Sequence, residues 1–368
     1  MNQPPLIQDV IDHLESIAPK YYQESYDNSG LITGNAKAGV TKILVTLDCT
    51  EDVVREAITS GVNLIVAHHP IVFKGLKRLT GSHYVERVLI LAIKNDIAIY
   101  AIHTNLDNVL SGVNQKICQR LGLTNTKVLM PKTGVLSKLV SFVPGGKTGD
   151  VLDALYLAGA GQIGNYKNCS FTSEGTGTFK PDEGAIPSVG TVNVQEFVEE
   201  SRIEVIFPTH LQHKIITALR KAHPYEEVAY YVTALLNDNQ EVGSGMTGDL
   251  PVPQEPLAFL RGLKDRMNVK VIRHTKMLDA PIKKVAVCGG SGSFLLNNAI
   301  SSGSQIFITS DFKYHEFFDA DGKIIIADIG HFESEEFTKE LLVDVLMKKF
   351  PTFAIIFSKT VTNPISYL

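Results

Sequence analysis

The sequence predicts an α/β fold in which two related halves, each containing a βαβ unit, form one domain that is interrupted by an inserted α+β domain. Two observations carry this prediction. One is an internal repeat whose copies align without a gap. The other is the segment between the copies, where strands and helices follow a different order. The 368 residues, 44% of them hydrophobic and 20% charged, suffice for two or three domains with apolar cores.

The repeat comprises residues 41–70 and 283–312. Its aligned pairs include Ile43 with Val285, Val45 with Val287, Ser60-Gly61 with Ser302-Gly303, and Ile65-Val66 with Phe307-Ile308. Each copy has the pattern of a strand, a turn, a helix ended by Ser-Gly, and a second strand that is buried on both faces. This pattern predicts a βαβ unit with a right-handed crossover in each half, and we expect the two halves to share one sheet.

A further strand follows each copy. The segments 97–107 and 323–335 both begin with an apolar β-branched run. The first continues into His103 and Asp107, and the second into His331 and Glu335. Sites in parallel α/β sheets form beyond the carboxyl ends of the strands. The polar residues at these ends therefore predict one cleft shared by the two halves.

The segment between the halves has its own order of elements. We expect a strand that begins near Leu136, a helix near 148–158, glycine-rich turns that include Gly175 and Gly177, a strand at 202–208, a helix at 210–223 and a strand at 227–235. The β-α-β, β-α-β order is that of ferredoxin-like domains. We therefore predict three segments: residues 1–134 and 238–368 as the halves of one domain, and 135–237 as the insert. Residues 237–256, rich in turn formers, are expected to be the return linker.

His68 and His69 follow the apolar run that ends at Ala67, and Pro70 stops the segment. Adjacent imidazoles at the end of a buried strand need partners for four ring nitrogens, and a metal ion supplies such partners. A single histidine here would be read as a solvated turn. The pair, together with further candidate ligands at other strand ends, favours a metal site.

The other candidate ligands are His331, Glu335 and Asp107. His331 and Glu335 are four residues apart at a predicted helix start, so they share one helix face. Each alone has an ordinary explanation, a solvated helix start or an Asx turn. We assign His103 and Asp311 to orienting a ligand. Three imidazoles and two carboxylates suit Zn, Fe, Mn or Ni better than Mg or Ca, and five ligands with a bridging Glu335 predict two divalent metal ions.

Two further groups could serve a substrate in the cleft. Gly289, Gly290 and Gly292 lie between a strand and a helix, where their amides could hold an oxyanion or merely form a tight turn. Lys313 and His315 follow the repeat position equivalent to His68-His69. They are candidates for a phosphate contact and for acid–base catalysis, against the alternative of an exposed turn.

Composition narrows the classes of partner. A net charge of -4 gives no overall case for nucleic acid or for an anionic membrane. The four cysteines are far apart and form no metal-binding pair, as in a reduced, cytoplasmic protein. No apolar run has the length of a membrane span, and the first residues lack the features of a signal peptide.

Six motifs together resemble one family. They are YDNSGLITG (26–34), AHHPIVFKGLK (67–77), HTNLDN (103–108), GGSG (289–292), SDFKYHE (310–316) and GHFESE (330–335). In this order they resemble the GTP cyclohydrolase 1 type 2 homolog family, also called the NIF-three-like family, and the insert resembles the CutA- and PII-like domain of its longer bacterial members. The resemblance implies a two-metal site on His68, His69, Asp107, His331 and Glu335. It also implies a homohexamer shaped as a ring.

The sequence is compatible with two functions. The leading one is a metal-dependent hydrolase that acts on a nucleotide or another phosphate-bearing small molecule. The alternative is a metal-responsive or metal-storing regulatory ring without catalysis, whose insert binds an effector. An open coordination position beside a charged pocket would favour the enzyme, whereas a closed ligand shell would favour the alternative.

Overall fold

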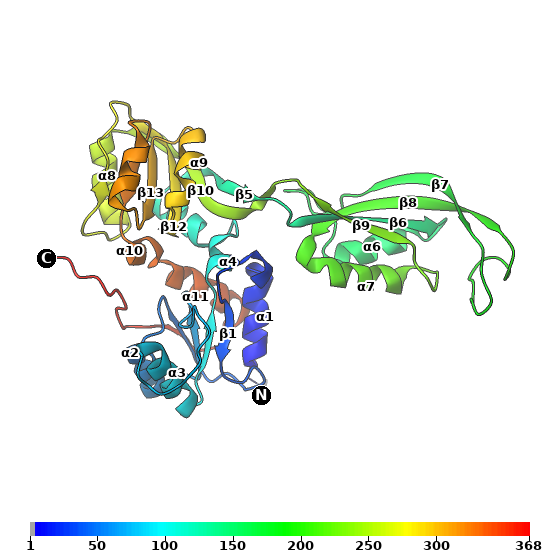
Figure 1. Ribbon diagram of the computed structural model, residues 1–368, viewed down its shortest axis with the longest axis horizontal. Helices are drawn as coiled ribbons and strands as arrows, with labels where there is room; N and C mark the ends of the chain where they lie inside the picture. Colours follow the sequence, from blue (N-terminus) through cyan, green and yellow to red (C-terminus); the bar gives the residue numbers. More distant parts are fainter. Residues whose placement is uncertain (1–3) are drawn as a thin grey trace. The chain divides into compact units, whose positions relative to one another are not determined.

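The computed structural model describes residues 4–368 and contains two compact units (Figure 1). Unit 1 consists of residues 4–130 and 241–368, and unit 2 of Pro131–Gln240. The predicted insert boundaries, 135 and 237, fall inside unit 2. Within the described residues no helix is both long enough and apolar enough to span a membrane.

Unit 1 contains two sheets. The five-stranded sheet has the order β1-β4-β3-β2-β15, and all its neighbours are parallel except β1 and β4. Its strands are β1 (Gly30–Thr33), β2 (Ile43–Thr46), β3 (Leu64–Ala67), β4 (Ala98–Ala101) and β15 (Ile355–Phe357). The central strands are fully buried, as their unbroken apolar runs predict.

Helices cover both faces of this sheet. Leu44, Ile65 and Ile99 pack with α2 and α3. Tyr100 faces the other side, where its hydroxyl contacts Glu15 of α1. The helices of this part are α1 (Ile7–Ile17), α2 (Glu51–Ser60), α3 (Tyr84–Lys94), α4 (Thr104–Asp107), α5 (Val113–Leu121) and α11 (Thr338–Lys349), with the short 3-10 helix η1 (Lys20–Tyr22).

The six-stranded sheet has the order β11-β14-β13-β12-β10-β5. The strands are β5 (Thr124–Lys132), β10 (Asn239–Gln254), β11 (Arg273–His274), β12 (Ile282–Ser291), β13 (Ile306–Ser310) and β14 (Ile325–Asp328). The accompanying helices are α8 (Pro256–Arg266), η3 (Ser293–Leu295), α9 (Leu296–Ser301), η4 (Tyr314–Ala320) and α10 (His331–Glu335). Strands β12, β13 and β14 are parallel, whereas β10 is antiparallel to β12 and β11 is antiparallel to β14.

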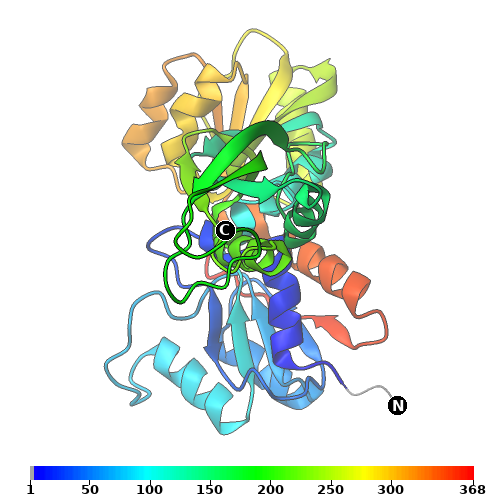
Figure 2. The ribbon, with the colours of Figure 1, turned by 90° about the vertical axis from the view of Figure 1, so that its right-hand side faces the viewer.

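The repeat is thus present as two βαβ units, β2-α2-β3 and β12-α9-β13, but they do not share a sheet. Each unit recruits its own neighbours, and Figure 2 shows the two sheets in separate parts of unit 1. The expectation of one common sheet was therefore wrong. The segment expected to be a return linker was also misjudged, because residues 239–254 form β10 and pair with β12.

Unit 2 has the element order β6-α6-β7-β8-α7-β9 and an antiparallel sheet in the order β7-β8-β6-β9. The elements are β6 (Leu136–Pro144), α6 (Thr148–Ala158), β7 (Phe171–Phe179), β8 (Glu196–Pro208), η2 (Thr209–Leu211), α7 (Gln212–Ala222) and β9 (Tyr230–Leu235). Both long helices pack on one face of the sheet, over a core that includes Leu139, Leu155, Ile203 and Leu219 (Figure 1). Gly175 and Gly177, expected in turns, lie inside β7.

Candidate metal centre

A cluster of four imidazoles and two carboxylates lies in unit 1, beyond the ends of strands from both sheets. His68 and His69 follow β3, His103 and Asp107 follow β4, and His331 and Glu335 begin and end α10 after β14. Three overlapping groups have one ligand atom per residue, all within 4.8 Å of one another. These groups are His68, His69 and His103; His69, His331 and Glu335; and His68, Asp107 and Glu335.

Glu335 is the common partner in the cluster. One of its carboxylate oxygens, Oε2, lies 3.0 Å from His69 Nε2 and 3.2 Å from His331 Nε2. Its other oxygen, Oε1, is 3.9 Å from His68 Nε2, which is too long for a hydrogen bond. Glu335 is buried, so this carboxylate brings side chains that are far apart in the sequence to one point.

Two buried atoms in the cluster have no hydrogen-bond partner among the described residues. They are His68 Nε2 and Asp107 Oδ1, which face each other at 3.6 Å. Leaving a buried polar atom unsatisfied costs about 1–3 kcal/mol, so such atoms call for an explanation. A cation between this nitrogen and this oxygen would satisfy both, which means that the residues fit a metal ion.

All four imidazoles are oriented through their Nδ1 atoms. His68 Nδ1 lies 2.8 Å from the carbonyl oxygen of Ile102, and His69 Nδ1 lies 2.8 Å from Asp48 Oδ1. His103 Nδ1 is 2.8 Å from Asp27, and His331 Nδ1 is 2.6 Å from Asp311. An oxygen that accepts a hydrogen bond from Nδ1–H keeps the ring proton on Nδ1 and leaves the Nε2 lone pair for a cation, as in carboxylate–histidine–metal arrangements.

The proximity of these groups shifts their pKa values. Burial alone would lower the pKa of His69, but the Glu335 and Asp48 carboxylates raise it to about 10. Burial would also lower the pKa of His331, but its hydrogen bonds with Asp311 and Glu335 raise that pKa to about 11.

The pKa values of the two carboxylates of the cluster shift in opposite directions. Burial and the Glu335 charge raise the pKa of Asp107 to about 7. The three imidazoles outweigh burial at Glu335 and hold its pKa well below its usual range. Metal-free, the cluster holds protons that a metal ion would displace.

The five predicted ligands therefore meet in one cluster, and so does His103, which was expected only to orient a ligand. Its ring centroid lies 5.4 Å from that of His68 and 5.2 Å from that of His69. Asp311 contacts His331 as described above. Sequence reasoning missed Asp48 and Asp27. Asp48 comes two residues after β2, so the strand-end rule that selected His68 could have found it. Asp27 precedes β1, and no such rule applies to it.

The predicted role of Gly289 and Gly290 as amide donors to a substrate does not agree with the structure. The Gly289 amide already donates to Asn114 Oδ1 at 2.9 Å, and the Gly290 amide donates to Ser334 Oγ at 2.9 Å. The absence of a side chain has a steric reason instead. A Cβ on Gly290 would lie 2.4 Å from Glu335 Oε1, and one on Gly292 would lie 2.4 Å from Thr309 Oγ1. These glycines let Glu335 and β13 approach β12 closely.

Lys313 and His315 lie at η4, and both are exposed. The His315 ring packs against Tyr314 and Phe318, with centroids 5.2 and 6.4 Å away. Among the described contacts, none joins either residue to the six-residue cluster. Their participation in catalysis stays a prediction.

Comparisons with known proteins give a consistent result. The model of the Duf34/NIF3 (NGG1p interacting factor 3) family matches residues 5–364. The GTP cyclohydrolase 1 type 2 homologs of Halalkalibacterium halodurans and Bacillus subtilis are 39% and 38% identical to this chain over 367 residues, with 98% of each chain covered. A Bacillus cereus protein related to NIF3 has a crystal structure similar to this chain, with a TM-score of 0.87, 39% identity and 100% of both chains covered. A Staphylococcus aureus protein has a TM-score of 0.79 at 28% identity, with 99% of both chains covered.

Proposed function

The chain belongs to the Duf34/NIF3 family, and from this membership and the cluster geometry we propose that it is a metal-dependent hydrolase with a dinuclear centre. The observation that carries the proposal is the orientation of the four imidazoles. Each Nδ1 is held by an oxygen, while buried Glu335 and the unsatisfied pair of His68 Nε2 and Asp107 Oδ1 lie at the centre. A bound cation would give the unsatisfied nitrogen and oxygen atoms a partner.

The protein ligands would be His68, His69, Asp107, His331 and Glu335, with Glu335 between the two metal positions. His103 is a sixth candidate. Zn, Fe, Mn and Ni all suit this mixture of imidazole and carboxylate. When bound, such ions lower the pKa of water and polarise a phosphoryl or carbonyl oxygen. The chain's own contribution is to hold the ligands in one protonation state and one orientation, through Asp48, Asp27, Asp311 and the Ile102 carbonyl.

The substrate class we propose is a nucleotide or another phosphate-bearing small molecule. The name carried by the relatives, GTP cyclohydrolase 1 type 2 homolog, makes GTP the first compound to test. Lys313 would meet the substrate's negative charge, and His315 would exchange a proton. Both roles depend on the alignment of the repeat, and alanine substitutions should lower the rate while leaving metal content unchanged.

The decisive experiment measures metal and activity on the same preparation. Protein purified without chelator is analysed for bound metals and then incubated with GTP, other nucleotides and simple phosphoesters. We expect substantial bound metal and turnover that EDTA abolishes and metal restores. Bound metal without turnover of any compound would favour the alternative, a metal-responsive or metal-storing regulatory protein. That alternative is supported by the number of protein donors, which could close the coordination shell.

We also propose a ferredoxin-like fold for the insert and a homohexameric assembly. The strand order β7-β8-β6-β9 supports the first proposal, because it matches a βαββαβ chain whose two central strands are the first and third. Family membership supports the second, which light scattering on the eluted protein would test.

A further inference from the structure

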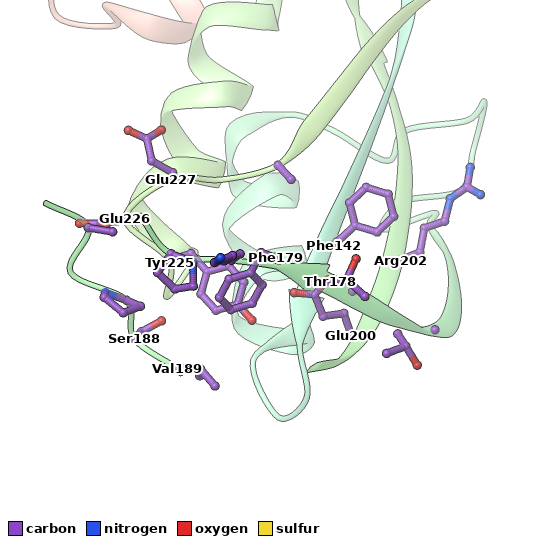
Figure 3. A pocket seen from close by; sticks show the side chains of 18 of the residues that line it. Phe142, Thr178, Phe179, Ser188, Val189, Glu200, Arg202, Tyr225, Glu226 and Glu227 are labelled. Carbon is purple, nitrogen blue, oxygen red and sulfur yellow. The ribbon is translucent and has the colours of Figure 1, made fainter. Parts of the chain in front are cut away.

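Unit 2 has a pocket on the face of its sheet that the helices leave open (Figure 3). Its volume is about 780 Å³, within the range of sites for small organic molecules. Strands β7 and β8 form its floor, and residues 179–189 and 225–227 form its walls. In β8, Ile203 and Val205 face the helices, so Glu200 and Arg202 face the pocket.

Glu200 is the unusual group in this pocket. It is only 7% exposed, yet no Lys, Arg or His side chain among the described residues lies within ion-pair distance of it. A buried carboxylate of this kind normally has a cationic partner. Arg202, its neighbour on the same face, is already paired with Glu204 at 2.6 Å.

The floor of the pocket is shaped around Glu200. Gly175 lies opposite Glu200 in the β7–β8 register. A Cβ on Gly177 would lie 2.0 Å from Glu200 Oε2, so no other residue fits there without displacing the carboxylate. A glycine inside a strand weakens it and marks a close approach of another group. The Glu-Gly-Thr-Gly sequence of β7 therefore provides space for a carboxylate that is kept in the pocket.

Two aromatic rings and a tyrosine hydroxyl lie beside the carboxylate. The rings of Phe179 and Tyr225 pack with centroids 5.9 Å apart (Figure 3). The Tyr225 hydroxyl is buried next to Glu200 but has no hydrogen-bond partner of regular geometry among the described residues. His223 cannot supply a positive charge, because its Nδ1 accepts from the Tyr225 amide and its Nε2 donates to the Phe142 carbonyl.

We propose that this pocket binds a small organic cation, an ammonium group carried on an apolar or aromatic body. Glu200 supplies the counter-charge, and the faces of Phe179 and Tyr225 provide cation–π contacts. Five carboxylates and only two cationic side chains line the pocket, and this excess of negative charge favours a cation over nucleotides and other phosphate-bearing molecules. The pocket shares no residue with the six-residue cluster of unit 1, and its ligand has the opposite charge to the substrate proposed there.

The test uses three probes that share a phenylethyl group, with the full-length chain. They are protonated 2-phenylethylamine, the neutral 2-phenylethanol and the anionic 3-phenylpropionate, each followed by calorimetry or ligand-observed NMR. We expect saturable binding of the ammonium compound and at least about tenfold weaker binding of the other two, as for a hydrogen bond to a charged group. Equal binding of all three, or no binding of the ammonium compound, would overturn the proposal.

The matched variants are Glu200→Gln and Glu199→Gln. Glu199 is the adjacent, exposed residue of β8 and does not line the pocket. We expect Glu200→Gln to weaken binding of the ammonium probe by about tenfold or more and Glu199→Gln to leave it unchanged.

A third variant, Ser188→Trp, changes an exposed residue of the pocket wall and should block the pocket without destabilising the fold. This variant keeps the test valid if Glu200→Gln does not fold. Unchanged binding in Ser188→Trp and in folded Glu200→Gln contradicts the proposal. So does binding of a lysine-rich peptide without binding of the ammonium probe, which would assign the pocket to a protein partner.

Discussion

The two repeated halves of unit 1 share a backbone plan but contribute different groups to the cluster. Strand β3 of the first half is followed by His68-His69, whereas the equivalent strand β13 ends at Ser310 and is followed by Asp311. The first pair supplies candidate ligands. In the second pair, Ser310 donates to the Gly290 carbonyl at 2.6 Å, and Asp311 orients His331. The same backbone position thus holds a candidate ligand in one half and a residue that orients a candidate ligand in the other.

The residues that follow the next strand are, by contrast, alike in the two halves. Both β4 and β14 are followed by a histidine and, four residues later, a carboxylate: His103 with Asp107, and His331 with Glu335. In both halves the histidine Nδ1 is held by an aspartate. The position of a strand end therefore places a polar side chain at the cluster in both halves, while the type of side chain at that position differs between the halves.

The largest expected effect tests whether the second half dominates the cluster. Glu335 faces three imidazoles, whereas Asp107 is near His68 only in the described ion pairs. Glu335→Gln should therefore remove nearly all bound metal, and Asp107→Asn should remove less. Metal content per chain, measured by mass spectrometry on protein purified without chelator, checks both expectations.

The control for this experiment is Glu336→Gln, which makes the same chemical change one residue along, at a side chain that lies 3.9 Å from Lys339. It should retain wild-type metal content. Full metal occupancy in Glu335→Gln would show that the halves do not depend on this carboxylate.

The second expected effect is a pH dependence to which both halves contribute. The pKa of His69 is raised to about 10 and that of His331 to about 11. When no metal is bound, both imidazoles therefore carry a second ring proton and a positive charge near neutral pH. A metal must displace these protons. Its apparent affinity should therefore fall by about tenfold per pH unit for each displaced proton as pH is lowered.

Competition with a chromogenic chelator between pH 6 and 8 measures this slope. His331→Gln removes one of the two protons and should make the slope shallower. The same apparent metal affinity at pH 6 and at pH 8 would mean that His69 and His331 release no proton when metal binds. It would also mean that the two halves are not linked through Glu335.

The third expected effect compares the positioning carboxylates of the two halves. Asp48→Asn and Asp311→Asn each remove the charge that holds an imidazole, and losses of about 10–100-fold in metal affinity are typical of such changes. Asp48 should matter more, because the side chains of His69 and Asp48 are 14% and 34% exposed, against 39% and 47% for His331 and Asp311. Water can replace the more exposed partner.

Metal titrations of these variants should include Asp265→Asn, an exposed position on α8, as the control. A larger loss in Asp311→Asn than in Asp48→Asn would reverse the ranking and make the second half the more constrained one.

The smallest expected effect concerns a feature that the two halves share, the glycine that follows the helix of each βαβ unit. Gly61 and Gly303 are aligned in the repeat and have φ values of 66° and 77°. A Cβ added at either glycine would meet no atom of the surrounding structure within 4 Å. Alanine at either position should therefore cost about 1–2 kcal/mol of unfolding free energy through backbone strain alone. Urea denaturation should give the two variants the same loss, and metal content should be unchanged.

Gly290→Ala provides the contrast, because its φ is also positive, at 63°, but its Cβ would meet Glu335 Oε1. It should lose metal as well as stability. A Gly61→Ala or Gly303→Ala variant that also loses metal would show that the helix ends, and not only the strand ends, are coupled to the cluster.

Much of unit 1 follows from local sequence patterns. The β-branched runs and the Ser-Gly pairs predict both βαβ units, because residues buried on both faces and a left-handed helix end leave little alternative. The predictions failed where local preference was weak. Strand β7 contains Gly175 and Gly177, and β10 contains Gly245 and Gly248, so both resemble turns in sequence. Pairing with β8 and β12 overrides this preference.

By itself the sequence determined which side chains stand at the strand ends, and hence the candidate histidine and carboxylate ligands, because unbroken apolar runs and a helical i, i+4 spacing can be read from a linear pattern. Only the tertiary structure decided the rest. It put the repeats in separate sheets, brought Asp27 and Asp48 to the imidazoles, and gave the Gly289 and Gly290 amides to Asn114 and Ser334. These are contacts between residues far apart in the chain, which depend on how the packed elements meet and leave no periodic trace in the sequence.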